Sequence, residues 1–436
     1  MTALYGTIRE ALHGPSHVKA MLTGIKAMLV WLAIVAAVRR VLLTMGWIAP
    51  ILLVGLGISL VGLHQLGLIN AWLFPIKQVG IAFIALSLAC LTSARILKRV
   101  ERQHLSNSSS VQSDRATSRK VSSKRKIAST SAGSKSTWRK RLLTVVVVIL
   151  VGLNAIAFLG SYYMTHVVEP GSIGIGFPKP QSTRTPAERN LPYTTERIEL
   201  GNSAWLEAWK IPSQQVTSRG TALLFHGNLG TKGGQLIGPA QSFSELGYES
   251  LLVDFQGSGG SSGNTVTIGM REAREVQAVL QYARDTNMPA PYVMYGVSMG
   301  SAAIMRAITV LDIDPDAIVI ELPFTRLLDA VKSRIEYMHF PSAIVSEAIV
   351  FWGGLQHGFN GFAHNPIDYA ANIDIPTLVL HGEQDKWMSV EDIQAIADNF
   401  AGPKQLVISA DAGHHQLIGV DRPLWRTSLT NFLYSL

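Results

Sequence analysis

A serine in a glycine-rich turn is the residue around which the chemistry of this chain can be organised. The segment Gly296-Val-Ser-Met-Gly300 follows an apolar run at residues 292–295 and precedes small and apolar helix formers. A strand that turns sharply into a helix, with serine at the apex and glycine two residues to either side, exposes the serine hydroxyl as a nucleophile. The glycines relieve crowding where the serine takes a strained backbone conformation. We therefore predict that Ser298 is a catalytic nucleophile.

The chain contains a second copy of the same pattern, Gly259-Gly-Ser-Ser-Gly263. There the apolar run at residues 251–255 stops several residues earlier, and Asn264-Thr265 follows in place of a helix. Such a density of glycine and serine is typical of a loop. Because a motif has meaning only in the right structural context, the pattern favours Ser298.

A serine nucleophile needs a base, and the base needs an acid that orients it. In this arrangement the acid and then the histidine follow the serine along the chain. Asp385 follows the predicted strand 377–380 directly, and His414 lies in the loop after the last predicted strand. We predict these two residues as acid and base, with Glu383 and His415 as the nearest alternatives.

The tetrahedral intermediate needs two backbone N–H groups that face its oxyanion. We expect one from Met299, at the start of the helix after the serine, and one from Asn228 in the loop Phe225-His-Gly-Asn228. Gly227 allows that loop to approach the substrate closely. His226 could act as a second base, but a loop-stabilising role is favoured. No histidine pair has the spacing of a metal site, and we expect neither a metal nor a cofactor.

Strand-like and helix-like segments alternate after residue 190. The predicted strands are 197–200, 204–211, 221–225, 250–255, 292–295, 317–321, 377–380 and 405–409, and the predicted helices are 234–246, 268–286, 299–311, 390–400 and 423–434. The later strands are short and continuously apolar, as in a parallel sheet covered on both faces. Alternating units of this kind predict a doubly wound, mostly parallel eight-stranded α/β domain. Residues 323–373 form an insertion that we expect to be a small helical cap at the ligand-binding edge of the sheet.

Composition and charge distribution narrow the functional classes. Of 436 residues, 47% are hydrophobic and only 16% are charged, which is unlike an ordinary soluble protein. Residues 95–141 hold 14 Lys/Arg and 2 acidic residues, a net of +12, whereas residues 164–436 hold 18 basic and 27 acidic residues, a net of −9. An acidic domain argues against nucleic-acid binding. The single cysteine, Cys90, excludes intramolecular disulfides and a cysteine-based metal site.

Uncharged segments predict a membrane region before the α/β domain. Residues 41–63 and 142–163 lack charges and are long enough to cross a bilayer, and the shorter run 78–94 is a further span. We expect a membrane region at 1–94 with a helical hairpin, a basic disordered linker at 95–141, a transmembrane helix at 142–163, and the α/β domain at 164–436. The basic linker should stay in the cytoplasm and attract anionic lipid headgroups. The α/β domain is then extracytoplasmic, and we expect a multi-pass protein of a bacterial inner membrane.

Four blocks carry a resemblance to a known superfamily: Phe225-His-Gly-Asn228, Asp254-Phe-Gln-Gly-Ser-Gly-Gly260, Gly296-Val-Ser-Met-Gly300, and His381-Gly-Glu-Gln-Asp385 with Ala412-Gly-His414. Over residues 190–436 the sequence resembles the α/β-hydrolases, and most of all the ABHD/Bem46-like membrane-associated serine hydrolases. The resemblance implies the α/β-hydrolase fold and a structural role for the second glycine motif. Members act on lipid esters, acyl thioesters or peptides, and residues 1–163 have no counterpart in the resemblance.

The sequence therefore predicts a membrane-anchored serine hydrolase that cleaves an ester or related acyl bond through an acyl-enzyme. Ser298 attacks, His414 transfers the proton and Asp385 orients His414, while the N–H groups of Asn228 and Met299 hold the oxyanion. The expected partners are a small-molecule or lipidic acyl substrate and the membrane. An acyltransferase, thioesterase or peptidase with the same triad is the enzymatic alternative. A non-catalytic membrane scaffold that binds anionic lipid is the other.

Overall fold

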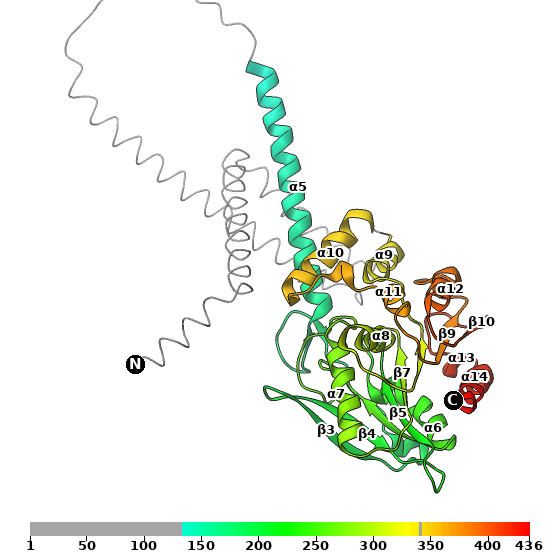
Figure 1. Ribbon diagram of the computed structural model, residues 1–436. Coiled ribbons are helices and arrows are strands. Elements are labelled where there is room, and N and C mark those ends of the chain that lie inside the picture. The colour runs from blue at the N-terminus through cyan, green and yellow to red at the C-terminus, as the bar shows by residue number, and fades with distance from the viewer. Residues whose placement is uncertain (1–132, 340–341) are drawn as a thin grey trace, which may run out of the picture. The chain divides into compact units, whose positions relative to one another are not determined.

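The computed structural model describes residues 133–339 and 342–436 (Figure 1). The predicted spans 41–63 and 78–94, and residues 95–132 of the predicted linker, lie outside the described residues. The chain divides into two compact units, with the boundary between Leu153 and Asn154.

The first described element is the long helix α5, Gly133–Thr165. It begins inside the range predicted as linker, because helix formation is cooperative and Lys and Arg are good helix formers that extend an apolar helix. Its segment Val148–Thr165 is long and apolar enough to cross a membrane, and no other helix among residues 133–339 and 342–436 meets that condition. The boundary between the two units falls within this helix.

The second unit is built on an eight-stranded sheet with the strand order β10-β9-β8-β7-β5-β6-β4-β3. The strands from β6 to β10 in this order pair in parallel, and β4 and β3 add an antiparallel edge. The strands are β3 (Thr194–Gly201), β4 (Ala204–Ile211), β5 (Gly220–Phe225), β6 (Tyr248–Val253), β7 (Tyr292–Val297), β8 (Ala317–Glu321), β9 (Thr377–Gly382) and β10 (Lys404–Ser409). The prediction of a mostly parallel α/β sheet is confirmed. A short pair, β1 (Val167–Val168) with β2 (Phe177–Pro178), follows α5.

Helices cover both faces of the sheet, which explains why its central strands are apolar at every position. Leu223 and Leu224, neighbours on the fully buried β5, belong to two different core clusters. One cluster includes α7 (Glu272–Asp285), α8 (Met299–Leu311) and α12 (Val390–Asn399), and the other includes α6 (Ile237–Glu245), the short α13 (Leu417–Val420) and α14 (Arg422–Ser435). Adjacent side chains of a strand point to opposite faces, so continuous hydrophobicity requires two layers of helices.

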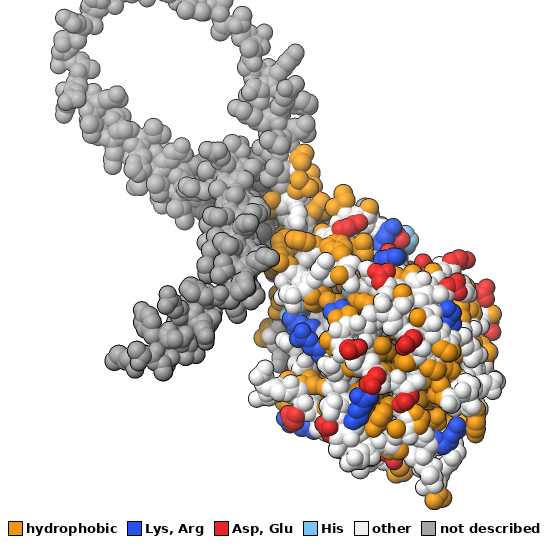
Figure 2. All heavy atoms as spheres, in the orientation of Figure 1, with side chains coloured by type: hydrophobic (Ala, Val, Ile, Leu, Met, Phe, Trp, Pro, Cys, Tyr) orange, Lys and Arg blue, Asp and Glu red, His pale blue; other side chains and the backbone are white. Residues whose placement is uncertain are grey.

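The insertion between β8 and β9 is helical. It contains α9 (Leu327–Tyr337), α10 (Ser342–His357), a 3₁₀ turn η4 (Gly361–Ala363) and α11 (Pro366–Ala370). We call this insertion the cap. Ile335 and Ile349 of the cap pack with Ala157 of α5, and Trp352 donates a hydrogen bond to Asn154 Oδ1 at 3.1 Å. Apolar side chains gather over the cap in Figure 2. Phe351 of α10 is exposed.

Candidate active site

The turn after β7 has the geometry that the glycine pattern predicts. Ser298 lies between β7 and α8 with φ 51° and ψ −105°, a positive φ that is strained for a residue with a Cβ. A Cβ on Gly296 would lie 2.6 Å from the backbone of Gly300 and Ser301, and a Cβ on Gly300 would lie 2.5 Å from Phe225 O. Only glycine fits at these two positions, so the sharp turn and its contact with the end of β5 depend on both.

Ser298 is half-buried and its backbone is fixed by the neighbouring strand. Its N–H donates to Glu321 O at 2.8 Å, and its own carbonyl accepts from Ala302 N in α8 at 3.1 Å. The loop after β5 passes next to Ser298: a Cβ on Gly227 would lie 3.5 Å from Ser298 Cβ. The hydroxyl of Ser298 is therefore presented beside the loop that carries Asn228.

Asp385 and His414 are brought together by adjacent strands. Residues of β9 and β10 pair in register up to Gly382 and Ser409, so the loops that follow leave the same edge of the sheet. His414 Nδ1 lies 2.6 Å from Asp385 Oδ2. Since a carboxylate only accepts, Nδ1 carries the proton of this hydrogen bond, and Nε2 is left for chemistry.

The environment of Asp385 keeps its carboxyl group ionised. Burial by itself raises the pKa of Asp385, but the hydrogen bond and charge of His414, together with the N–H of Trp387 at 2.8 Å, lower that pKa on balance. The Asp385 side chain is fully buried, whereas the His414 side chain is 18% exposed. A buried anion next to a partly exposed imidazole is the arrangement that orients a base and stabilises its protonated form.

The two residues predicted to form the oxyanion hole lie next to Ser298 in the sequence or on the loop beside it. Asn228 follows β5 and Met299 is the first residue of α8, and neither backbone N–H donates a hydrogen bond to another residue that the structure describes. Such free amides beside a nucleophile are suited to an oxyanion. No hydrogen bond joins the Ser298 hydroxyl to His414 within the described part of the chain. Catalytic hydrogen bonds of this kind commonly tighten only when substrate binds.

The alternatives considered for the base and acid lie elsewhere. Glu383 and His415 are exposed. His226 is fully buried; its Nδ1 donates to Gly227 O at 2.7 Å and its Nε2 accepts from Phe255 N at 3.1 Å. Burial lowers the pKa of His226, so the ring is neutral and occupied by loop contacts. This agrees with the loop-stabilising interpretation of His226.

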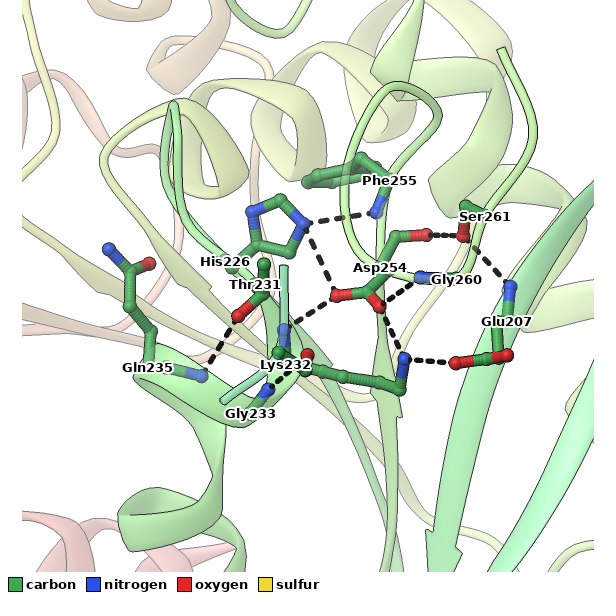
Figure 3. A network of polar contacts seen from close by, with 12 residues as sticks. Glu207, His226, Thr231, Lys232, Gly233, Gln235, Asp254, Phe255, Gly260 and Ser261 are labelled. Atoms are coloured by element: carbon green, nitrogen blue, oxygen red, sulfur yellow. Dashed lines mark hydrogen bonds and ion pairs between the residues drawn. The ribbon is translucent and has the colours of Figure 1, made fainter. Parts of the chain in front are cut away.

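A buried charged network supports the loop after β5, and sequence reasoning missed its centre, Lys232. Its ammonium group is fully buried and pairs with the Asp254 carboxylate, as well as with Glu207 Oε1 at 2.7 Å (Figure 3). Asp254 also accepts from the Lys232 N–H at 2.7 Å and from Gly260 N at 3.1 Å. Lys232, which follows the loop, thus joins β4 and β6 to the second glycine motif through Glu207 and Asp254. The second glycine motif therefore has a structural role.

A second buried carboxylate lies behind Ser298. Glu321, the last residue of β8, accepts from the Tyr295 hydroxyl, from Leu417 N at 2.5 Å and from Trp425 Nε1 at 3.3 Å. Burial raises the pKa of Glu321 to about 7, although these hydrogen bonds oppose the shift. The Glu321 backbone carbonyl accepts from Ser298 N, so this network connects the turn around Ser298 to the segment after His414.

Sequence reasoning also missed Trp387 beside the acid and base. Its ring centroid lies 4.4 Å from that of His414, and the guanidinium carbon of Arg334, in α9 of the cap, lies 4.2 Å from the centroid of the Trp387 ring. The only sequence signal for Trp387 was its position two residues after Asp385. No sequence signal pointed to Arg334. Among residues 133–339 and 342–436, no group of three or more His, Cys, Asp or Glu side chains is placed to hold a metal.

Comparisons with known proteins agree with the geometry. A family model described as serine aminopeptidase, S33, matches residues 217–347. Lysophosphatidylserine lipase ABHD12 from Macaca fascicularis is 27% identical over 187 residues, which cover 39% of this chain and 42% of that protein. Protein bem46 from Schizosaccharomyces pombe is 30% identical over 193 residues, which cover 43% of this chain and 62% of that protein. The chain thus spans less than two thirds of the length of these relatives.

A solved structure shows the same fold. The esterase Pf2001 from Pyrococcus furiosus superposes with a TM-score of 0.50 and 20% sequence identity, covering 61% of this chain and 99% of that one. At this identity the likeness concerns the fold alone. The sheet order, the glycine turn around Ser298 and these matches together show that the chain is similar to α/β hydrolases, among them ABHD12 and bem46.

Proposed function

We propose that this chain is a membrane-anchored serine hydrolase that cleaves an ester or related acyl bond of a lipidic substrate. The observation that carries the proposal is the 2.6 Å contact between His414 Nδ1 and the buried carboxylate of Asp385, on loops that leave the sheet at the edge next to Ser298. Triads of this kind are recognised by geometry and by the roles of their members.

In the proposed reaction, His414 Nε2 takes the hydroxyl proton while Ser298 Oγ attacks the acyl carbon. The N–H groups of Asn228 and Met299 face the oxyanion, and Asp385 stabilises the imidazolium. His414 then gives the proton to the leaving alcohol as the acyl–oxygen bond breaks, which leaves an acyl-enzyme. Water, deprotonated by His414, attacks the acyl carbon and releases the acid and the free serine.

Two findings favour a lipidic substrate and a membrane location. One relative is named as a lysophosphatidylserine lipase. The segment Val148–Thr165 of α5 is long and apolar enough to span a bilayer. We propose that α5 anchors the α/β domain of residues 164–436 at the membrane, on the extracytoplasmic side. The description of the matching family model as a serine aminopeptidase makes peptide hydrolysis the second candidate.

The nucleophile is tested by labelling the full-length protein in detergent with a fluorophosphonate probe. Wild type should be labelled and Ser298→Ala should not, because only an activated serine reacts with the probe. Ser261→Ala, in the second glycine motif, is the matched control and should keep the label if its melting curve shows a folded protein.

An unlabelled wild type, or a label that persists in Ser298→Ala, would contradict the proposal. Analysis of the products formed from two substrates, a monoacylglycerol and a short peptide with a free N-terminus, then separates the two candidate reactions. Release of fatty acid supports the proposed activity, and release of an N-terminal amino acid supports the peptidase.

A further inference from the structure

A cationic side chain of the cap lies close to the proposed acid and base. The Trp387 ring contacts His414 on one side, with the ring planes inclined at 52°, and Arg334 lies over the same indole. The backbone N–H of Trp387 donates a hydrogen bond to Asp385 Oδ1 at 2.8 Å. One aromatic side chain therefore lies in contact with both the guanidinium and His414 of the proposed catalytic pair.

Arg334 has donors to spare. Its Nη1 donates to Ala330 O, one turn earlier in α9, at 2.6 Å. No carboxylate lies within ion-pair distance of its guanidinium in the parts of the chain that the structure describes. A guanidinium carries five N–H groups in a planar fork, so most of them are left for another partner.

Some other arginines of the domain have a carboxylate partner. Arg284 pairs with Asp314 at 2.8 Å, Arg426 with Glu245 at 2.6 Å, and Arg326, at the start of the same helix, with Asp329 at 3.6 Å. Burial lowers the pKa of Arg334 to about 10, and the nearby charge of Asp385 opposes this shift. The side chain is thus a half-buried cation at neutral pH.

The groups that face Arg334 leave the local charge positive. Asp385 is the nearest acid, and its carboxylate is already bonded to His414. Lys386, next to Trp387, extends over the Tyr337 ring of α9 at 5.9 Å and adds a second cation. On α9 itself, Glu336 is paired with Lys332 at 4.0 Å and accepts from Ser342.

We propose that Arg334 binds an anionic group of the substrate, a carboxylate or a phosphate, next to the acyl bond that Ser298 attacks. The inference rests on the proposed hydrolase function and adds the chemical class of its substrate. Arginine binds planar carboxylates and phosphates through two parallel hydrogen bonds, which fix orientation as well as affinity. Stacking on Trp387 keeps the fork in place while its edge remains available to the substrate.

The test compares three oleoyl esters in mixed micelles: neutral 1-oleoylglycerol, 1-oleoylglycerol 3-phosphate, and oleoyl lactate, which carries a carboxylate. Arg334→Gln removes the charge and keeps much of the side-chain length. For the ester whose charge Arg334 binds, KM should rise about 10- to 100-fold, the loss expected for a charge-assisted hydrogen-bonded pair. The KM for 1-oleoylglycerol should stay within about twofold, because a neutral ester gains nothing from the guanidinium charge.

Arg334→Lys should recover part of the loss, since it restores the charge without the fork. Arg326→Gln, at the residue that precedes the same helix and is paired with Asp329, is the matched control and should leave all three KM values unchanged. The anionic ester with the larger increase in KM identifies phosphate or carboxylate as the bound group.

Two results overturn the inference. One is an equal change in KM for neutral and anionic esters in Arg334→Gln, and the other is no change for any of them. In both cases fluorophosphonate labelling and cleavage by wild type persist, so the proposed hydrolase function survives. If wild type neither reacts with the probe nor cleaves any of the three esters, the hydrolase function itself fails, and the inference fails with it.

Discussion

Glu321 shows how one buried residue ties the proposed nucleophile to the segment that carries the proposed base. Its carboxylate is bonded to Leu417 and Trp425 on the C-terminal side of His414, and its carbonyl holds the backbone of Ser298. A carboxyl group in this position has to lose its hydration. The consequence is a pKa of about 7 in the folded protein, against an ordinary value of 4.5.

This pKa makes the stability of the domain depend on pH. Below pH 4.5 the group is protonated in both the folded and the unfolded chain; between 4.5 and about 7 only the unfolded chain ionises, so the free energy of unfolding falls as pH rises. Glu321→Gln keeps a neutral group of the same shape and removes this term. The difference in unfolding free energy, wild type minus variant, should therefore decline across this window by roughly 3 kcal/mol at most.

Denaturant unfolding of the α/β domain, followed by tryptophan fluorescence at several pH values, measures that difference. Glu275, whose pKa burial raises to about 8, contributes a similar trend that both proteins share, and it cancels in the comparison. Parallel curves for wild type and Glu321→Gln would show that the Glu321 carboxyl does not titrate differently in the folded state.

Among the elements, the turn between β5 and α6 is held by a buried lysine and its two carboxylate partners. It is a short π-helix, η3 (Lys232–Leu236), preceded by Thr231, whose hydroxyl accepts from Gly234 N at 3.0 Å. The lysine at its start extends to the carboxylates of Asp254, after β6, and Glu207, on β4, as Figure 3 shows. Its ammonium group also lies 4.5 Å from the centroid of the Trp209 ring. The turn therefore joins three strands next to the loop that carries Asn228.

Lys232→Met should destabilise the domain strongly, because it leaves the buried carboxylate of Asp254 without its counter-charge. Removing one partner of a buried pair typically costs about 3–5 kcal/mol. Chemical denaturation of the two proteins at one pH measures the difference. Lys210→Met is the matched control: Lys210 pairs with Glu249 at 3.3 Å near the surface, and its loss should cost no more than about 1 kcal/mol. Equal losses in the two variants would contradict a central role for Lys232.

Elements that are defined by neighbouring residues could be predicted from the sequence, whereas features that depend on contacts between distant residues could not. Strands such as β5 and β8 could be predicted because every position is buried, and the apolar run itself marks them. The start of β6 at Tyr248 was missed by two residues, because its Glu249 breaks the apolar run. Lys232 and Arg334 could not be found in this way, since their partners are distant in sequence and no local pattern announces a buried cation. The catalytic roles of Ser298, Asp385 and His414 stay predictions until labelling tests them.

At the scale of the whole molecule, the charge asymmetry and α5 together suggest how the chain is placed. The net charge is +12 over residues 95–141 and −9 over residues 164–436, on either side of the apolar segment of α5. Basic segments beside a membrane span are retained in the cytoplasm. The proposed topology therefore has the linker inside and the α/β domain outside.

Reporter fusions test this topology. In bacterial cells, alkaline phosphatase fused after Leu436 should be active and green fluorescent protein at the same site should be dark, because each works on one side of the membrane only. The same reporters placed after Lys120, within the basic linker, are the internal control and should give the reverse pattern. Fluorescence from the fusion after Leu436 would put the α/β domain in the cytoplasm.

The way the cap is attached has a consequence for how such a protein diversifies. The cap leaves the sheet at Glu321, at the carboxyl end of β8, and returns at Thr377, at the amino end of the neighbouring parallel strand β9. Both ends of the insertion are thus fixed by paired strands of the sheet, and a longer or shorter insertion adds only a small closure entropy. Ser298, Asp385 and His414 all lie outside the inserted segment. Lineages can therefore exchange cap helices, and with them residues such as Arg334, without replacing the residues of the proposed triad.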